Sequence, residues 1–357
     1  MARLCCFCGN SFTGQKRNRE HIISDWLVRE ADLKKRTMSV HIGGHTFQAA
    51  MKRIVGDSCE TCNSAFSALE GQAQTAFSKV RKGDLLLEQD AEALLDWLDK
   101  VRVGTWLWLL GVSKNHIRIT PKFHIDARVG RKDRIVMVAR YPARPEMKGL
   151  AFWGVGEQFL FQPSAIGLLI NNIALVSVST DFILAQHLRK VRLIWDVNDK
   201  AQQTANLKPL SDGESPIRLK ILGAPYIFGQ CIGPPQALID ELGLEGVSPS
   251  PRHPDLVQTK VMALNSDLTP KSGSLDPVRD TFVNMDAHLA LMEMNVSLTF
   301  EFIFRELLNS NLSEIRKLPE GQGHIEQFNS FLAEQRAYMN VLRERYFQHT
   351  GLRLPTD

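Results

Sequence analysis

The sequence has no long uninterrupted apolar run. Its longest apolar stretch, residues 165–185, is broken by Asn171, Asn172, Ser177, Ser179, Thr180 and Asp181. A membrane span needs about 20 consecutive apolar residues, so this stretch does not predict one. The first ten residues hold three cysteines where a secretory signal has its apolar core. We therefore expect a cytoplasmic protein that does not enter a membrane.

Proline and tyrosine are also scarce, with 16 and 4 residues among 357. With 44% hydrophobic and 23% charged residues, the composition excludes a collagen-like, coiled-coil or largely disordered chain. No internal repeat and no Walker or Rossmann glycine motif is present. The length is enough for two domains of ordinary size.

The net charge of +4 is unevenly distributed, because residues 1–83 hold 13 Lys/Arg against 7 Asp/Glu. An excess of positive charge at one end indicates contact with a polyanion such as DNA. Three clusters supply it: Lys16, Arg17 and Arg19; Lys34, Lys35 and Arg36; Lys79, Arg81 and Lys82. The alternative is that these side chains form an ordinary solvated surface.

Five of the six cysteines lie in the first 62 residues, and four of them form two C-x-x-C pairs: Cys5, Cys8, Cys59 and Cys62. Two such pairs suit a structural Zn²⁺, which takes four thiolates at tetrahedral corners. Disulfides do not fit a reducing compartment, and a redox dithiol needs only one pair. Cys6 is left to pack or to face solvent, and Cys231 is expected to be a small buried hydrophobic residue.

Two further motifs accompany the cysteine pairs. Glu20-His21-Ile22 follows the first pair, and Asn63 follows the second pair directly. After Asn63, Phe66, Leu69, Ala73 and Phe77 recur at helical spacing up to Gly83, which predicts a helix over residues 64–82 with Asn63 at or near its N-cap. In this order the motifs resemble the HNH endonuclease family, more narrowly its bacterial branch with two C-x-x-C knuckles, E-H-I and C-x-x-C-N.

The resemblance implies a β-hairpin followed by a helix, held by zinc, with one catalytic divalent ion. It implies that His21 is the general base and that Glu20 and Asn63 bind Mg²⁺ or Mn²⁺, with all three side chains converging beside a cleft. The substrate it implies is the phosphodiester backbone of DNA. A role in bacterial defence against phage or mobile DNA is a further implication, with a second copy of the chain or a defence protein as partner.

The chain departs from the family pattern at one position. The middle Asn of the family has no counterpart, since residues 22–58 contain no Asn. Asp57, His41 or a backbone carbonyl is left to orient His21. Glu70 lies two helical turns beyond Asn63, about 10 Å along the axis, so it is expected to support the site from outside or to form a salt bridge. His41 and His45 flank Gly43-Gly44, which predicts a hairpin turn; the alternative is that they bind zinc.

The remaining chain predicts a mixture of helices and strands. Helices are expected over 88–112, 286–307 and 313–348, the last with a break at 321–323. Strands are expected at 117–119, 134–141, 150–153, 158–161, 165–178 and 191–195, and linkers near 198–216 and 245–280. The expected fold class is α+β: a zinc-stapled ββα-metal (HNH) module over 1–83, then a larger mixed α/β domain over 84–357 with a helical C-terminus. The role of that second domain is open between sensor, oligomerisation and target recognition.

The sequence therefore predicts a metal-dependent endonuclease of the HNH type. Two alternatives remain. The first is a non-catalytic zinc-ribbon module that binds nucleic acid, and the second is a protein-interaction adaptor whose knuckles only shape the amino end.

Overall fold

The computed structural model describes most of the chain. The described residues are 4–33, 37–42, 45–114, 119–121, 123–144, 147–155, 159, 162–180, 182–188, 191–197, 203–209, 226–233, 248–250, 253–281, 283–317 and 321–354. The cluster Lys34, Lys35 and Arg36 lies outside them.

The amino-terminal region is built on two antiparallel strands, β1 (Arg17–His21) and β4 (Val55–Cys59). Helix α2 (Glu60–Lys82) follows β4 without a loop, so two paired strands lead into a helix, but these strands do not form the β-hairpin that the resemblance implies. The strands are not joined by a tight turn, because residues 22–54 form a separate group of elements between them. These are α1 (Asp25–Glu30), β2 (Thr37–Ile42), β3 (His45–Ala50) and the short 3₁₀ helix η1 (Met51–Arg53).

The register of β2 and β3 confirms the predicted hairpin, since Ile42 pairs with His45 across residues 43–44. The side chains of His41 and His45 are not among those described, so the alternative of zinc binding by these histidines lies outside the described part of the chain.

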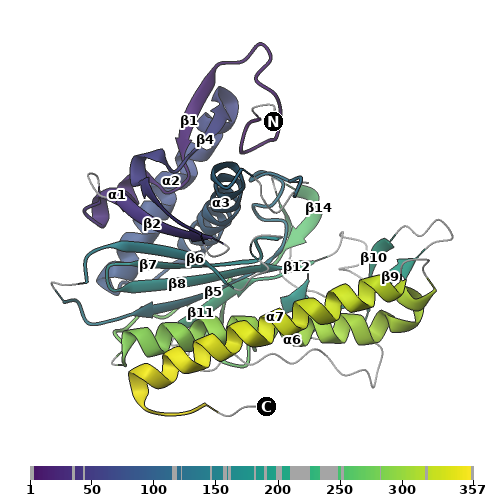
Figure 1. Cartoon of the computed structure of the whole chain (residues 1–357). Coiled ribbons are helices and arrows are strands. Elements are labelled where there is room, and N and C mark those ends of the chain that lie inside the picture. Colours follow the sequence, from purple (N-terminus) through teal and green to yellow (C-terminus); the bar gives the residue numbers. More distant parts are fainter. Residues whose placement is uncertain are drawn as a thin grey trace.

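Helices α2 and α3 (Glu88–Val112) confirm the two helices predicted from apolar spacing. Helix α2 ends where Gly83 takes a left-handed conformation at φ 76°, and the backbone N–H of Asp84 bonds to the Lys79 carbonyl at 2.9 Å. This glycine termination is the expected stop signal. The two helices pack against each other (Figure 1). Trp97 and Trp106 of α3 are fully buried.

Beneath these helices lies a six-stranded antiparallel sheet in the order β15-β11-β5-β8-β7-β6 (Figure 1). The strands are β15 (Met262–Leu264), β11 (Tyr226–Gln230), β5 (Asp133–Arg140), β8 (Ile173–Thr180), β7 (Ala165–Ile170) and β6 (Leu150–Gly154). The predictions at 134–141 and 150–153 are thus confirmed. The run 165–178 is two strands rather than one, because Asn171 adopts φ 52° and turns the chain between β7 and β8.

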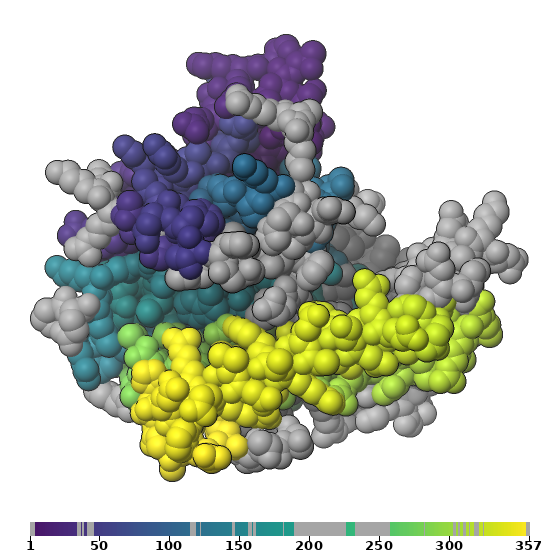
Figure 2. Space-filling view, in the orientation of Figure 1, coloured from purple at the N-terminus to yellow at the C-terminus, as the bar shows by residue number. Residues whose placement is uncertain are grey.

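The sheet is covered on both faces, which explains why its central strands β5, β8 and β7 carry buried apolar side chains on both faces. On β5, Val136 and Val138 belong to the hydrophobic cluster that contains α3, whereas Ile135 and Met137 pack with α6 (Met285–Arg316). This alternation follows from the two-residue period of a strand. Helix α7 (Gly321–Thr350) packs along α6, and the pair lies on the opposite side of the sheet from α2 and α3 (Figures 1 and 2).

Several expectations for the second half of the chain were wrong in detail. The segments expected as linkers contain β10 (Gln203–Pro209), β13 (Ser248–Ser250), β14 (His253–Gln258) and β15. Polar and proline-rich composition favours loops, but pairing with a neighbouring strand satisfies the same backbone groups: β10 pairs with β9 (Val191–Val197), and β14 with β13 and with β12 (Ile232–Gly233). The glycines at 321–323 open α7 instead of interrupting a helix. The strands predicted at 117–119 and 158–161 lie mostly outside the described residues, and Ile119 and Phe159 are not in strands.

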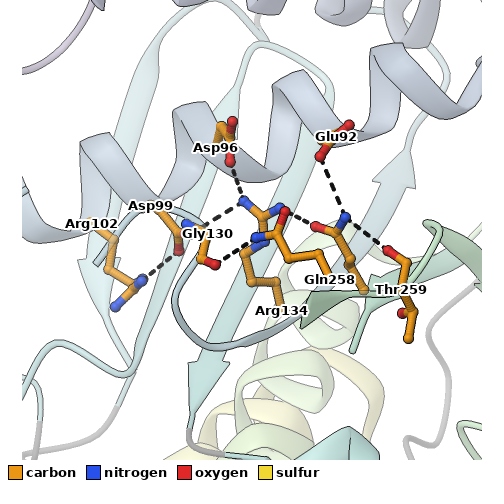
Figure 3. Close-up of polar contacts among 9 residues, drawn as sticks. Glu92, Asp96, Asp99, Arg102, Gly130, Arg134, Gln258 and Thr259 are labelled. Carbon is orange, nitrogen blue, oxygen red and sulfur yellow. Dashed lines mark hydrogen bonds and ion pairs between the residues drawn. The ribbon is translucent and has the colours of Figure 1, made fainter. Parts of the chain in front are cut away.

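A buried polar network fastens α3 to the sheet (Figure 3). Arg134 of β5 is fully buried and forms ion pairs with Asp96 and Asp99 of α3, while Asp99 also pairs with Arg102. Arg134 also donates to the Gln230 side chain of β11. Charges that are buried are stable only when paired and hydrogen-bonded, so this network fixes the position of α3 over β5.

Buried residues on both sides of Gly83 belong to one hydrophobic cluster, which extends from Cys5 to Val278. The division into units 1–83 and 84–357 stays a prediction. Within the part of the chain that the structure describes, no helix is both long and apolar enough to cross a membrane.

Candidate metal centre and candidate active site

The four cysteines of the two C-x-x-C pairs come together in space. The sulfur atoms of Cys5, Cys8, Cys59 and Cys62 all lie within 4.8 Å of one another, and those of Cys5 and Cys59 are 3.8 Å apart. A tetrahedral zinc with Zn–S bonds of about 2.3 Å separates its sulfurs by about 3.8 Å. The cluster has the ligand number, ligand type and spacing to hold a structural metal such as zinc.

Local structure explains how each pair presents its thiols. In the first pair, the backbone N–H of Cys5 bonds to the Asn10 carbonyl at 2.9 Å, and Gly9 turns the chain at φ 75°. In the second, Cys59 ends β4 and is the N-cap of α2, so Cys62 follows in the first helical turn. The backbone N–H of Cys59 points to the Cys5 sulfur at 3.4 Å.

The pKa of Cys59 is lowered, although its burial acts in the opposite direction. The hydrogen bonds that lower it come first from the Cys62 backbone and then from the side chains of Cys62, Cys5 and Cys8. Burial raises the pKa of Cys8 and of Cys62. Zinc binds thiolates, so metal binding must displace the protons that the raised pKa values hold on Cys8 and Cys62.

The other two cysteines behave as packing residues. Cys6 is buried, and a Cβ atom placed on Gly56 would lie 2.7 Å from its sulfur. Burial is the main cause of the raised pKa of Cys6, with the charge of Cys5 second. Cys231 is buried as expected.

Glu20 is half-buried and belongs to an ion-pair cluster around a buried lysine. Its Oε1 is 2.6 Å from Nζ of Lys100, a fully buried residue of α3. The same ammonium group bonds to Glu70 of α2, whose Oε2 accepts a hydrogen bond from Trp26 Nε1 at 2.9 Å. Burial lowers the pKa of Lys100, but the negative charges of Glu70 and Glu20 raise it by a larger amount. The pKa therefore lies above its ordinary value, and Lys100 is charged. For Glu70 the salt bridge is therefore the observed arrangement.

His21 ends β1 and pairs with Val55 of β4. Since successive side chains of a strand point to opposite faces, His21 shares its face with Arg19 and Asp57, whereas Glu20 points toward α2 and α3. The convergence of Glu20, His21 and Asn63 on one ion stays a prediction.

Asn63 lies within the first turn of α2 and is not its N-cap, a position that belongs to Cys59. Its Oδ1 accepts a hydrogen bond from Ser58 Oγ at 3.3 Å. Asp57 forms an ion pair with Arg17 at 2.9 Å, and the described residues show no hydrogen bond or ion pair between Asp57 and His21.

The predicted DNA-contacting residues separate into two groups. Arg17, Lys79 and Arg81 are held in ion pairs within the fold, with Asp57, Asp90 and Glu30 respectively. Lys16, Arg19 and Lys82 are exposed. Lys82 stands at the far end of α2, about 30 Å from its first residue. A single phosphate therefore cannot meet both ends, and contact at both requires an extended strand or duplex.

Sequence reasoning missed Lys100, the partner of Glu20. A signal existed, because Lys100 interrupts a long apolar helix next to Val101, and a lysine there must find counter-charges. It also missed a hollow of about 590 Å³ beside β4, lined in part by Arg19, Arg53 and Trp108.

Comparison with models of protein families, with curated proteins and with solved structures found no match. The case for a function therefore depends on the residues of this chain. Of the features used in that case, the structure directly supports the metal-binding geometry of the four cysteines.

Proposed function

We propose that the amino-terminal region is a zinc-stapled, metal-dependent endonuclease of the HNH type that hydrolyses phosphodiester bonds of DNA. One observation carries the proposal. The four-cysteine cluster ties the ends of segment 5–62 together, so that β1, with Glu20 and His21 at its end, pairs with the strand that leads into α2 and Asn63.

His21 is the group proposed to activate water. An imidazole has an ordinary pKa of about 6.5, so its neutral form can take a proton from water near pH 7. Hydrolysis needs this step because water itself is a weak nucleophile toward a phosphodiester. The exposed Arg19 on the same strand face is suited to hold the phosphate.

Glu20 and Asn63 offer a carboxylate and an amide oxygen, the donors that suit Mg²⁺ or Mn²⁺. Because Lys100 already binds Oε1 of Glu20, an ion at this carboxylate has to share it with the ammonium group. Such an ion, when bound, neutralises charge on the phosphate and stabilises the leaving 3′ oxygen.

The test is nicking of supercoiled plasmid with a panel of divalent ions, comparing wild type with His21→Ala. We expect the substitution to reduce the nicking rate by a factor of about 10² to 10⁴. Bound zinc and the melting temperature should stay near those of wild type. His349→Ala is the matched control, because His349 is exposed on α7. Equal rates for wild type and His21→Ala would refute the mechanism.

The ion pair between Glu20 and Lys100 favours a second candidate, a zinc-stapled module that binds nucleic acid without cutting it. A carboxylate already neutralised by a buried lysine is a structural element as it stands. This candidate predicts a gel shift that weakens steeply with salt while the plasmid stays supercoiled. An adaptor that binds only protein predicts no salt-dependent affinity for DNA.

A further inference from the structure

A hollow of about 590 Å³ opens beside β4, and its lining also includes residues of α3 together with Thr120, Pro121 and His124. Its size lies within the usual range of pockets for small molecules, about 300–1,000 Å³. The lining residues used in the argument are Arg19, Arg53, Val55, Gly104, Trp108 and Gly111.

The residues of α3 that line this hollow are apolar, and the absence of a side chain at Gly111 leaves space beside them. Trp108 is nearly buried, and its indole N–H is fixed by a hydrogen bond to the Arg53 carbonyl at 3.3 Å. One turn further on, a Cβ atom on Gly111 would meet nothing within 4 Å. Only 8% of the Trp108 surface is exposed, so a flat apolar group can touch it over a small area and lies mainly in the space that Gly111 leaves.

The charged side chains that line the hollow include Arg19, Arg53 and Asp57, and Asp57 is already paired with Arg17. Arg19 and Arg53 are exposed, and among the described residues neither forms an ion pair, in contrast to Arg17, which is paired with Asp57. His124, also in the lining, adds no charge near pH 7, because burial lowers its pKa below the ordinary value. An apolar interior under two unpaired guanidinium groups complements a flat ring that carries an anionic group.

The hollow also adjoins the proposed catalytic face. Val55 and Asp57 line it, and in the strand pair they lie opposite His21 and Arg19. Directly paired residues of antiparallel strands share one face, so His21 shares a strand face with Arg19 and Val55 of the lining. His21 itself is not in the lining, and Gly56, which pairs with Glu20 on the other face, also lines the hollow.

We propose that this hollow binds one nucleotide of the nucleic-acid strand, with its base against Trp108 and its phosphate at Arg19 and Arg53. The link to cleavage rests on the proposed function, whereas the binding itself does not. Contacts with an aromatic side chain accept any base, and phosphate pairing with arginine adds no base preference. The pocket is therefore a positioning site with broad base tolerance.

The test is isothermal titration of the full-length zinc-loaded protein with 5′-dAMP, 5′-dTMP and deoxyadenosine, without added divalent ions. We expect both nucleotides to bind, and deoxyadenosine to bind about tenfold or more weakly because it lacks the phosphate. Arg53→Gln should reduce nucleotide affinity about tenfold and leave the affinity for deoxyadenosine unchanged.

Gly111→Phe should fill the space for the base and reduce the affinity for all three compounds at least tenfold. Gly71→Phe is the matched control: Gly71 is also a helical glycine whose Cβ would meet nothing within 4 Å, but it lies on α2, outside the lining of the hollow. It should bind as wild type does.

Three results would overturn the proposal: no binding of nucleotides at millimolar concentration, equal affinity for nucleotide and nucleoside, or wild-type affinity in Gly111→Phe. A protein that binds nucleotides as expected but never nicks plasmid refutes the proposed function alone. A protein that nicks plasmid through His21 but fails the titration refutes the pocket alone.

Discussion

The ammonium group of Lys100 lies 2.6 Å from Oε1 of Glu20 and also bonds to Glu70, so one buried cation of α3 joins a strand to a helix. Three segments distant in the sequence meet at this point: β1, α2 and α3. The two carboxylates together hold the pKa of Lys100 above its ordinary value in spite of its burial.

Removing this cation should destabilise the protein. We expect Lys100→Met to lower the free energy of unfolding by about 3 kcal/mol at neutral pH, since Glu20 and Glu70 lose their counter-charge while remaining largely buried. Urea unfolding at pH 7.5 measures the loss. Lys82→Met, at an exposed position of α2, should change the stability little, and an equal loss in both variants would contradict this account.

Metal content tests the cysteine cluster. Wild type and Cys6→Ala should each hold one zinc per chain, because Cys6 lies outside the group of four sulfurs. Cys59→Ser should lose the metal, since three thiolates and a hydroxyl bind zinc far more weakly. Elemental analysis after dialysis against a weak chelator measures the content. Zinc retained in Cys59→Ser but absent from Cys6→Ala would mean that the metal is held elsewhere.

Two glycines of the α2 region should respond to alanine with opposite sign. Gly83→Ala should destabilise by about 1–2 kcal/mol, because a side chain disfavours its left-handed conformation. The new Cβ would also lie 2.3 Å from Nη1 of Arg140. Gly71→Ala, in mid-helix with open space around it, should stabilise by about 0.5–1 kcal/mol. Thermal unfolding of the two variants side by side gives the comparison, and a stabilised Gly83→Ala would show that the helix end is not held as described.

The pH dependence of stability should carry a contribution from Glu293 of α6. Burial raises its pKa from 4.5 to about 7, and the Tyr338 hydroxyl donates a hydrogen bond to it. A raised pKa means that the folded state binds the proton more tightly. The stabilisation is therefore complete below about pH 4.5 and is lost as the pH rises through 7.

Glu293→Gln removes this titration and keeps an oxygen for Tyr338 to bind. The stability difference between the variant and wild type should grow in favour of the variant by up to about 3 kcal/mol between pH 4.5 and pH 8. Asp133, whose pKa is also raised to about 7 by burial, contributes equally to both proteins and cancels from the difference. A difference that is flat with pH would exclude Glu293 as the source.

The sequence could predict the features that depend on local constraints. The spacing of Cys5, Cys8, Cys59 and Cys62 was sufficient to predict the four-cysteine cluster, because a structural zinc takes four ligands. Helix α3 was predictable because its apolar side chains recur along one continuous segment. The turn at Gly83 followed from the one residue type that accepts its backbone conformation without cost.

Contacts between distant segments were not predictable in this way. Lys100 is separated from Glu20 by 80 positions, and the packing of α2 on α3 decides that they meet. The hollow beside β4 depends equally on assembly, since the strand and Gly111 of α3 define it only after packing. The polar composition of β10 and β14 predicted linkers. They are strands because backbone pairing with the neighbouring strands β9 and β13 holds them extended.

The joining of Cys5 and Cys8 to Cys59 and Cys62 makes the intervening chain a closed ring whenever metal is bound. A single peptide-bond break between the two pairs would therefore leave the severed pieces tethered by a bridge that a chelator, and not a reductant, opens. With metal bound, the integrity of this region would thus depend on the four-cysteine cluster as well as on the covalent backbone.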